Sequence, residues 1–398
     1  MGFGQFVTFV AAVMATNALA IDTMLPALPA IGSALGVADE NERQWIITAY
    51  LLGFGAAQIV YGTLADRFGR RPVLLLALAL YALFSAVAGL ASSFEVMIAA
   101  RVLQGIGAAG TRVLAVTIVR DRYSGRQMAR VMSLAIMVFL TVPIAAPSLG
   151  QFILLFAPWQ AIFLVLAAFG AVVLVWAVLR LPETLHEEDR LPVSITRILG
   201  AFGVALRERQ AVGYMLAMAV MLGGLFGYIN SVQQVFAEVF HAPGLFPVVF
   251  GLTAVFIAAS SLLNARIVGR LGMHRVSHIA LLGYVLVAGA HAALALSGRE
   301  TLAVFTVCQT LMFFCFGLVS PNFGTIAMEP LGHIAGTASS VQGFVTHVGG
   351  ALLGFLIGQQ FDGSAIPMTL GFFAFGTGTL LIVIVTERGR LFRSGGAR

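Results

Sequence analysis

The stretch Gly62-Thr-Leu-Ala-Asp-Arg-Phe-Gly-Arg-Arg71 lies in a short gap between two hydrophobic runs. It carries one acid, three arginines and two glycines, where two membrane helices need only a tight polar turn. A hairpin between helices does not require so dense an array of charge. The stretch therefore predicts a set of charged contacts that can form and break, and the rest of the chain must indicate which groups they bind.

Composition places the chain in a membrane. Hydrophobic residues make up 59% of it, charged residues only 10%, and the mean hydropathy is +0.96. Apolar runs of about 20 residues, the length that crosses a bilayer, recur throughout. We expect spans at residues 6–33, 45–65, 73–93, 96–119, 129–152, 159–180, 211–236, 246–268, 276–297, 300–325, 335–359 and 366–386. The alternation typical of an outer-membrane barrel is absent, so the expected fold class is an all-α polytopic membrane protein with twelve transmembrane helices.

The positions of the basic residues predict the topology. All 23 are arginines, and Arg101 and Arg112 lie inside spans. Of the others, only Arg43 and Arg299 fall in loops on one side, and the rest fall on the opposite side. The positive-inside rule then predicts a multi-pass protein of the bacterial inner membrane with both termini in the cytoplasm. We attribute the net charge of +6 to this orientation and to anionic lipid headgroups, and expect no nucleic-acid partner.

The chain divides into two halves of six spans. We expect an N-terminal bundle at 1–180, a cytoplasmic connector at 181–210 and a C-terminal bundle with a short basic tail at 211–398. An amphipathic interfacial helix is expected from Ile195 to Arg209 in the connector. The segment from Arg266 to Arg275 repeats the arginine and glycine skeleton of the opening stretch, with Gly269 in place of the acid. Parallel repeats of six spans are a transporter architecture.

These residues carry a family resemblance. Gly62 to Arg71 resembles the loop 2-3 signature of the major facilitator superfamily, and Arg101-Val-Leu-Gln-Gly-Ile-Gly107 resembles its span-four signature. The likeness narrows to the bicyclomycin-resistance-like drug:proton antiporters. The stretches that carry it are Ile21 to Pro29, Val119 to Tyr123, Leu181-Pro-Glu-Thr-Leu185, Asn264 to Arg266 and Glu329 to Ala338. The resemblance implies two pseudo-symmetric six-helix bundles.

Span five is similar to the antiporter motif of that superfamily, with departures. Its stretch reads Pro143-Ile-Ala-Ala-Pro-Ser-Leu-Gly150, where Val142 and Gln151 replace two of the usual glycines. We expect Pro143 and Pro147 to kink the helix. We expect Gly150 to let span five pack closely against a helix of the other half. The departures weaken the inference of export and leave an importer or uniporter open.

Asp22 is the only acid deep inside a hydrophobic run. An ionisable side chain in lipid costs at least about 2.5 kcal/mol unless it is paired or faces a cavity. At 1.5 Å per residue, Asp22 in span one and Arg101 in span four reach a similar depth, so an ion pair is geometrically allowed. We expect Asp22 and Arg101 to be the proton-coupling residues. The alternative is a static structural ion pair.

The substrate cavity is predicted from helix faces. The resemblance implies that spans one, four, seven and ten line it, and soft side chains would add adaptable surface. The expected cavity residues are Met14, Asn17, Gln104, Arg112, Met137, Tyr228, Asn230, Gln234, Phe236, Phe313 and Asn322. Such a lining suits bulky amphipathic or cationic compounds, although ordinary packing between helices is the default for each position. Arg112 would either attract an anionic group or hold span four to a neighbouring carbonyl.

The opening stretch is the expected cytoplasmic gate. The resemblance implies that Asp66 lies near the start of span eleven, at Gly336 to Ser340, where a helix dipole favours negative charge. The arginines would bind Asp121, Glu329 or lipid phosphate. The expected gate residues are Gly62, Asp66, Arg67, Gly69, Arg70, Arg71 and Asp121. The alternative is a cluster that only enforces orientation.

The predicted function is therefore secondary active export of small amphipathic compounds or drugs in exchange for protons, by alternating access. The alternative is a proton-coupled or uniport transporter of a specific metabolite. No nucleophile motif, metal-spaced set or P-loop is present in the sequence, so we expect neither an enzyme nor ATP drive. We expect no cofactor beyond the proton gradient and no metal. The expected partners are a small-molecule substrate, protons and lipids, with the protein acting as a monomer.

Overall fold

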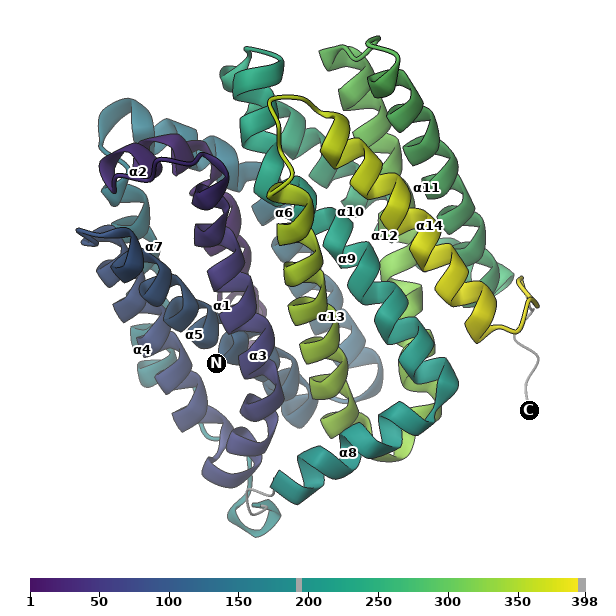
Figure 1. Ribbon diagram of the computed structural model, residues 1–398. Helices are drawn as coiled ribbons and strands as arrows, with labels where there is room; N and C mark the ends of the chain where they lie inside the picture. The colour runs from purple at the N-terminus through teal and green to yellow at the C-terminus, as the bar shows by residue number, and fades with distance from the viewer. Residues whose placement is uncertain (191–194, 393–398) are drawn as a thin grey trace. The chain divides into compact units, whose positions relative to one another are not determined.

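The computed structural model describes residues 1–190 and 195–392. Every regular element among these residues is helical, and twelve helices are long and apolar enough to cross a membrane, as the sequence predicts (Figure 1). Residues 191–194 of the expected connector and 393–398 of the expected basic tail lie outside the described residues.

The chain forms two compact units, Met1–Ile198 and Leu199–Arg398, which divide inside the expected connector. Unit 1 comprises α1 Phe3–Asp22, η1 Leu25–Ala27, α2 Leu28–Ala34, η2 Asn41–Gln44, α3 Trp45–Phe68, α4 Arg70–Gly89, α5 Phe94–Arg122, α6 Gly125–Phe156, α7 Gln160–Arg180 and η3 Glu187–Asp189. Helix α8, Ile195–Arg207, crosses the division. Unit 2 then comprises α9 Arg209–Gln234, η4 Val235–Val239, η5 Pro243–Leu245, α10 Phe246–Leu271, α11 Met273–Leu296, α12 Leu302–Met328, η6 Glu329–Ile334, α13 Ala335–Gly358 and α14 Ile366–Thr386.

The two units repeat the same helix pairings. In unit 1, α3 and α4 pack on α5, α4 packs on α7, and α1 packs on α6. In unit 2, α10 and α11 pack on α12, α11 packs on α14, and α9 packs on α13. The central helix of each set begins at a hydroxyl N-cap: Ser93 accepts the Val96 N–H, and Thr301 accepts the Val304 N–H. The internal repeat expected from sequence is therefore present in the packing.

The first span is broken rather than continuous. We expected one helix over 6–33, but α1 ends at Asp22 and the chain passes through a 3-10 turn before α2. Pro26 and Pro29 explain the break, because proline has no N–H to donate and its ring clashes with the preceding helical turn. Asp22 is thus the last residue of a helix and does not lie in the middle of one.

The charged stretch is helical almost throughout, which shortens the gap expected at 66–72 between the second and third spans. Helix α3 continues to Phe68 and α4 begins at Arg70, so Gly69 alone makes the turn. Its backbone has φ 97° and ψ 159°, a conformation that residues with a Cβ rarely adopt. Unit 2 repeats this turn at Gly272, with φ 81° and ψ 151°, between α10 and α11.

Helix α6 continues through Pro143 and Pro147 and packs against α1 of its own unit. A Cβ placed on Gly150 would meet the Thr23 carbonyl oxygen at 1.9 Å. This contact lies within unit 1, and the expected packing of Gly150 against the other half stays a prediction. The missing side chain lets α6 approach the backbone beside Asp22, where α1 has ended.

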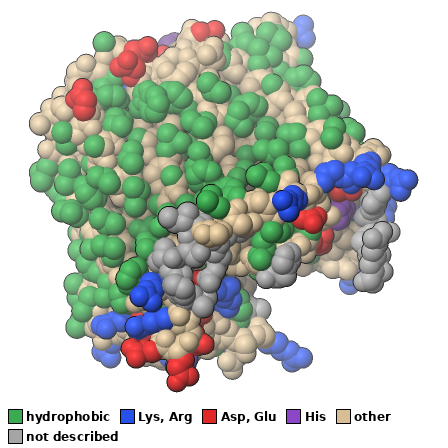
Figure 2. Space-filling model, turned by 60° about the horizontal axis from the view of Figure 1, so that its bottom comes forward, with side chains coloured by type: hydrophobic (Ala, Val, Ile, Leu, Met, Phe, Trp, Pro, Cys, Tyr) green, Lys and Arg blue, Asp and Glu red, His purple; other side chains and the backbone are tan. Residues whose placement is uncertain are grey.

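A helix is present where the interfacial helix was expected: α8 runs from Ile195 to Arg207, two residues short of the expected end, and lies across the ends of α9 and α13 (Figure 1). Its interfacial position stays a prediction. Phe202 of α8 contacts Phe344 of α13, with ring centroids 6.0 Å apart. On the face drawn in Figure 2, hydrophobic side chains cover most of the surface, and charged side chains lie mainly along its margins. That distribution matches a protein surrounded by lipid.

Candidate functional site

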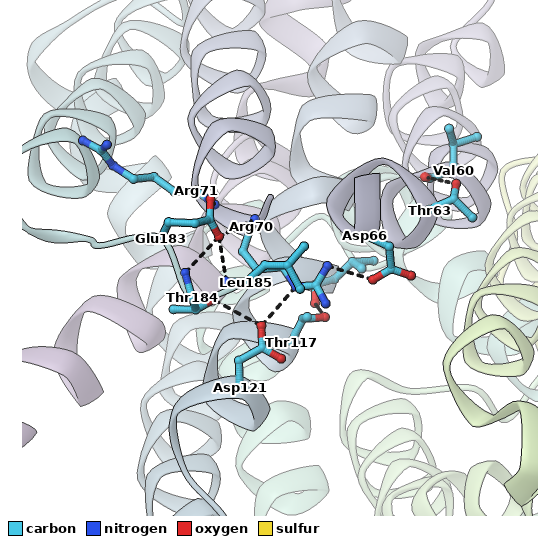
Figure 3. A network of polar contacts seen from close by, with 11 residues as sticks. Val60, Thr63, Asp66, Arg70, Arg71, Thr117, Asp121, Glu183, Thr184 and Leu185 are labelled. Atoms are coloured by element: carbon cyan, nitrogen blue, oxygen red, sulfur yellow. Dashed lines mark hydrogen bonds and ion pairs between the residues drawn. The ribbon is translucent and has the colours of Figure 1, made fainter. Parts of the chain in front are cut away.

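Arg70 is the centre of a charged network at the α3–α4 turn. Its side chain is 7% exposed and reaches two acids: Nη1 lies 2.7 Å from Asp66 Oδ1, and Nε lies 3.0 Å from Asp121 Oδ2. Figure 3 shows the guanidinium between these carboxylates. The predicted contact between an arginine of the stretch and Asp121 is thus made by Arg70. It ties the end of α3 and the start of α4 to the end of α5.

Glu183 completes this network and was missed as a site residue. Its carboxylate accepts the backbone N–H groups of Arg70 at 2.8 Å and Arg71 at 3.1 Å, and also those of Thr184 and Leu185 (Figure 3). The first two belong to the first turn of α4, whose N–H groups have no partner within the helix. Partial burial raises the pKa of Glu183, but the four N–H donors outweigh it and hold the pKa below its ordinary value of 4.5.

A signal for Glu183 was present in the sequence. It belongs to Leu181-Pro-Glu-Thr-Leu185, which carried part of the family likeness but received no role. Thr184 strengthens the network because its hydroxyl donates to Asp121 Oδ2 at 3.1 Å. Arg71 Nη2 donates to the Val178 carbonyl at 2.8 Å, whereas Arg67 is exposed. The expected contact of Asp66 with the start of span eleven joins two separate units and stays a prediction.

Asp22 is buried at the helix break. It is 5% exposed, and within the described residues it has neither a hydrogen bond nor an ion pair. The pair with Arg101 that the sequence allowed is therefore not formed. Asp22 is a buried carboxyl without a counter-ion, which makes its ionised form costly.

Arg101 is fully buried and has other partners. Its Nε donates to the Ile46 carbonyl at 3.0 Å, and its Nη1 donates to Gln104 Oε1 at 2.5 Å. The guanidinium also lies over the Tyr50 ring, 4.4 Å from its centroid. Gln104 in turn donates to Ser85 at 2.7 Å. These contacts hold α5 against α3 and α4, so Arg101 has a packing role whether or not it takes part in coupling.

The remaining unit 1 residues of the predicted cavity differ in exposure. Asn17 is buried and accepts the Tyr50 hydroxyl at 2.8 Å, which joins α1 to α3. Met14 is 8% exposed, Arg112 is half-buried, and Met137 is 45% exposed.

A small open pocket of about 200 Å³ lies between α1 and α6, lined by Leu19, Val138, Thr141, Val142, Ala145, Ala146 and Leu149. Leu19 is one turn from Asp22, so this apolar pocket begins close to the acid.

The unit 2 residues of the predicted cavity are buried. Phe313 packs edge-on against Tyr228 at 4.8 Å, and Tyr228 stacks on Phe250 at 5.7 Å. Gln234 is buried, and Asn322 donates to Asn264 at 2.7 Å. Neither amide atom of Asn230 has a partner in the described part of the chain, although the side chain is 1% exposed.

Phe236 has the environment of a core residue. It is fully buried, and its ring packs against Phe240, Phe246 and Phe305 of the same unit. The cavity roles of all eleven residues, Phe236 included, stay predictions.

The comparisons with known proteins identify the family. The sequence profile of the Major Facilitator Superfamily matches residues 9–354. The chain belongs to this superfamily. Its members are transporters rather than enzymes, which agrees with the twelve spans and the absence of a nucleophile motif.

Relatives within the Major Facilitator Superfamily support the narrower resemblance. The chain is 30% identical over 351 residues to a bicyclomycin resistance protein homolog of Haemophilus influenzae, with 87% of each chain covered. It is 32% identical to the uncharacterized MFS-type transporter YdgK of Bacillus subtilis, over 88% of this chain and 87% of the relative. It is 28% identical to the multidrug resistance protein MdtL of Salmonella heidelberg, with the same coverage.

Solved structures agree on the fold. The human organic anion transporter MFSD10 matches with a TM-score of 0.69 at 21% identity, covering 97% of this chain and all of that one. A D-xylose-proton symporter matches with a TM-score of 0.73 at 13% identity, covering 98% of each chain. At these identities the likeness concerns architecture. It confirms the predicted major facilitator fold.

Proposed function

We propose that this protein exports small amphipathic compounds or drugs in exchange for protons, by alternating access. The names of the bicyclomycin-resistance and multidrug-resistance relatives support the class of cargo. The observation that carries the coupling is Asp22, a buried carboxyl without a counter-ion at a helix break.

Asp22 has the features that a proton carrier needs. Because the ionised form lacks an arginine partner, it is costly until water or a cationic substrate reaches the site. The break after Asp22 leaves the last carbonyls of α1 without intrahelical donors, and α6 lies against the same backbone at Gly150. A movement of α6 relative to α1 would therefore change the solvation of Asp22 directly.

The network around Arg70 would be the cytoplasmic gate. Within unit 1 it fastens α3, α4 and α5 to the segment after α7 as one rigid end. Asp66 is half-buried, and only one of its two carboxylate oxygens bonds to Arg70. The gate would close when Asp66 meets the start of α13, where free N–H groups favour an anion.

The test is proton-driven uptake of ethidium and of bicyclomycin into inverted membrane vesicles that contain the full-length protein. Asp22→Asn should abolish stimulation by the proton gradient while binding to purified protein persists. Glu42→Gln, which neutralises an exposed acid, is the matched control and should transport normally. Gradient-dependent transport that survives in Asp22→Asn would remove Asp22 from the mechanism. Transport by the unaltered protein that ignores the gradient would instead favour a uniporter.

A further inference from the structure

Unit 2 contains a second cluster of titratable groups, apart from the residues discussed above. Tyr214 of α9, His274 and His278 of α11, and Glu387 directly after α14 meet at one end of the unit. Tyr214 and His278 are 0% and 1% exposed, and Glu387 is 8% exposed. Buried ionisable groups in direct contact share protons and respond to pH together.

The cluster corresponds to the Arg70 network of unit 1, with a change of chemistry. His274 stands two positions after the turn residue Gly272, as Arg71 stands two positions after Gly69. Glu387 follows the last helix of its unit, as Glu183 follows α7. Unit 2 therefore carries a histidine at position 274, where unit 1 carries the permanently charged Arg71, and it adds His278, whose counterpart in unit 1 is Leu75. Histidine is the side chain that titrates near neutral pH.

The hydrogen bonds define the protonation state of His278. The Phe392 backbone N–H donates to His278 Nδ1 at 3.2 Å, so Nδ1 carries no proton. The neutral ring then carries its proton on Nε2 and donates to the Tyr214 hydroxyl at 2.9 Å, and Tyr214 donates to Glu387 Oε1 at 2.8 Å. The three groups form a directed chain that requires a neutral His278.

The bond to Phe392 fastens the segment after α14. This segment turns back on the helix end with positive φ at Arg388, Gly389 and Phe392, and two of these residues are not glycine. Such backbone is strained for a residue with a Cβ and persists only while contacts hold it. The edge-on contact of the Phe392 ring with His278, at 6.0 Å, is lost if the bond breaks.

We propose that His278 is a proton-sensing site: a proton taken up on Nδ1 breaks the bond to Phe392 and frees the segment Arg388–Phe392 from unit 2. The added N–H would point at the Phe392 N–H, so the two donors repel. The sign follows from linkage. The fastened state requires neutral His278, so lowering the pH releases the segment and raising it restores the contact.

The other charged groups around His278 do not reproduce this response. His274 lies one turn away on α11 and 3.5 Å from Glu387, while Glu329 of η6 is held by Gln210 at 3.0 Å. Arg275, Arg388 and Arg390 are exposed. Burial raises the pKa of Glu387, but its hydrogen bonds to His274 and Tyr214 outweigh this and lower the pKa below 4.5. Glu387 therefore stays ionised between pH 5 and pH 8, as the proposal requires.

The test measures the mobility of a nitroxide label on the full-length protein in lipid nanodiscs. Cys308 and Cys315, the only cysteines, are replaced by serine, and Arg390→Cys carries the label. Between pH 8 and about pH 6.5, the ordinary pKa of histidine, the ratio of mobile to immobile label should change little. From there to pH 5 the ratio should rise by up to about tenfold per pH unit. A label at Arg275→Cys, on α11 itself, should not change.

Three substitutions decide between the groups. His278→Asn keeps an acceptor where Nδ1 stands but does not titrate, so the label should remain immobile at every pH. His278→Phe has no acceptor, and the label should be mobile throughout. His274→Gln should leave the pH response intact. A label that ignores pH in the unaltered protein, a pH response that survives in His278→Asn, or one that disappears in His274→Gln would each overturn the proposal.

Discussion

The carboxylate of Glu183 occupies the space that a side chain at position 69 would need. A Cβ built on Gly69 would come within 2.4 Å of Glu183 Oε2. The same carboxylate accepts the first two N–H groups of α4. Glu183, 114 residues later in the chain, can cap α4 only if its carboxylate reaches the backbone there. It reaches the backbone because position 69 has no side chain.

Gly69→Ala should destabilise unit 1 strongly. The alanine would face both a φ of 97° and the Glu183 carboxylate, and we expect a loss of about 2–3 kcal/mol. Gly36→Ala is the matched control, because Gly36 also has positive φ, at 70°, but no atom lies within 4 Å of its Cβ position. Thermal unfolding in detergent should show a clearly larger drop for Gly69→Ala. Equal drops in unfolding temperature for the two variants would mean that the Glu183 carboxylate does not lie against position 69.

Glu183→Gln should lower thermal stability at pH 7, because an amide is a weaker acceptor than a carboxylate for the α4 N–H groups. The pKa of Glu183 is depressed in the folded protein, so the stabilisation is present above the ordinary value of 4.5 and is lost as the pH falls through the folded pKa. The difference between variant and unaltered protein should therefore shrink only below pH 4.5. Glu188→Gln, an exposed glutamate of the same loop, should show no difference at any pH.

Gly150→Ala should impair the contact between α1 and α6. The added methyl group would meet the Thr23 carbonyl at 1.9 Å, so α6 must move away, at an expected cost of about 1–3 kcal/mol. Gly378→Ala on α14 is the control, since nothing lies within 4 Å there and alanine in an open helix position should stabilise by about 0.4–1 kcal/mol. Opposite signs of the shift in unfolding temperature are expected. A stabilising Gly150→Ala would contradict the close approach.

Gln104→Leu should destabilise α5 by about 1–3 kcal/mol. It would leave the buried Arg101 Nη1 without its acceptor, and the Ser85 hydroxyl, which still donates to the Tyr81 carbonyl, would lose the N–H that Gln104 donates to it. Leu103→Ala, next in the chain but 36% exposed, should cost much less. Unfolding by denaturant measures both. If Gln104→Leu were neutral, Arg101 would have other partners than those in the structure.

Asp66→Asn tests the gate. The variant should weaken the contact with Arg70 and raise the labelling rate of a cysteine placed at the exposed Arg67, without loss of insertion. Asp121→Asn is the comparison, because Asp121 holds Arg70 and Thr184 within unit 1 and should affect stability more than labelling. Equal labelling of Asp66→Asn and the unaltered protein would count against a gate.

Run length and charge asymmetry were sufficient to predict the helices. Each span needs only its own apolar residues, and the interfacial helix needs only its own periodicity, so both follow from local sequence. The ends of helices were less predictable. Helix α1 ends at Asp22 because of the prolines that follow, and an average of hydropathy over a window does not detect them. Helix α3 extends through Asp66 and Arg67 because charged residues at a membrane surface do not end a helix.

The sequence by itself determined that this is a membrane protein of twelve spans in the Major Facilitator Superfamily, because apolar run length and short motifs are local properties. Tertiary structure decided the partners of the charged groups. The Glu183 carboxylate accepts the backbone N–H of Arg70, 113 residues earlier in the chain, and His278 accepts the backbone N–H of Phe392, 114 residues later. Asp22 and Arg101 form no pair. Such pairings depend on how helices distant in sequence pack, since a shift of one helical turn moves a side chain by about 5.4 Å and exchanges its partner.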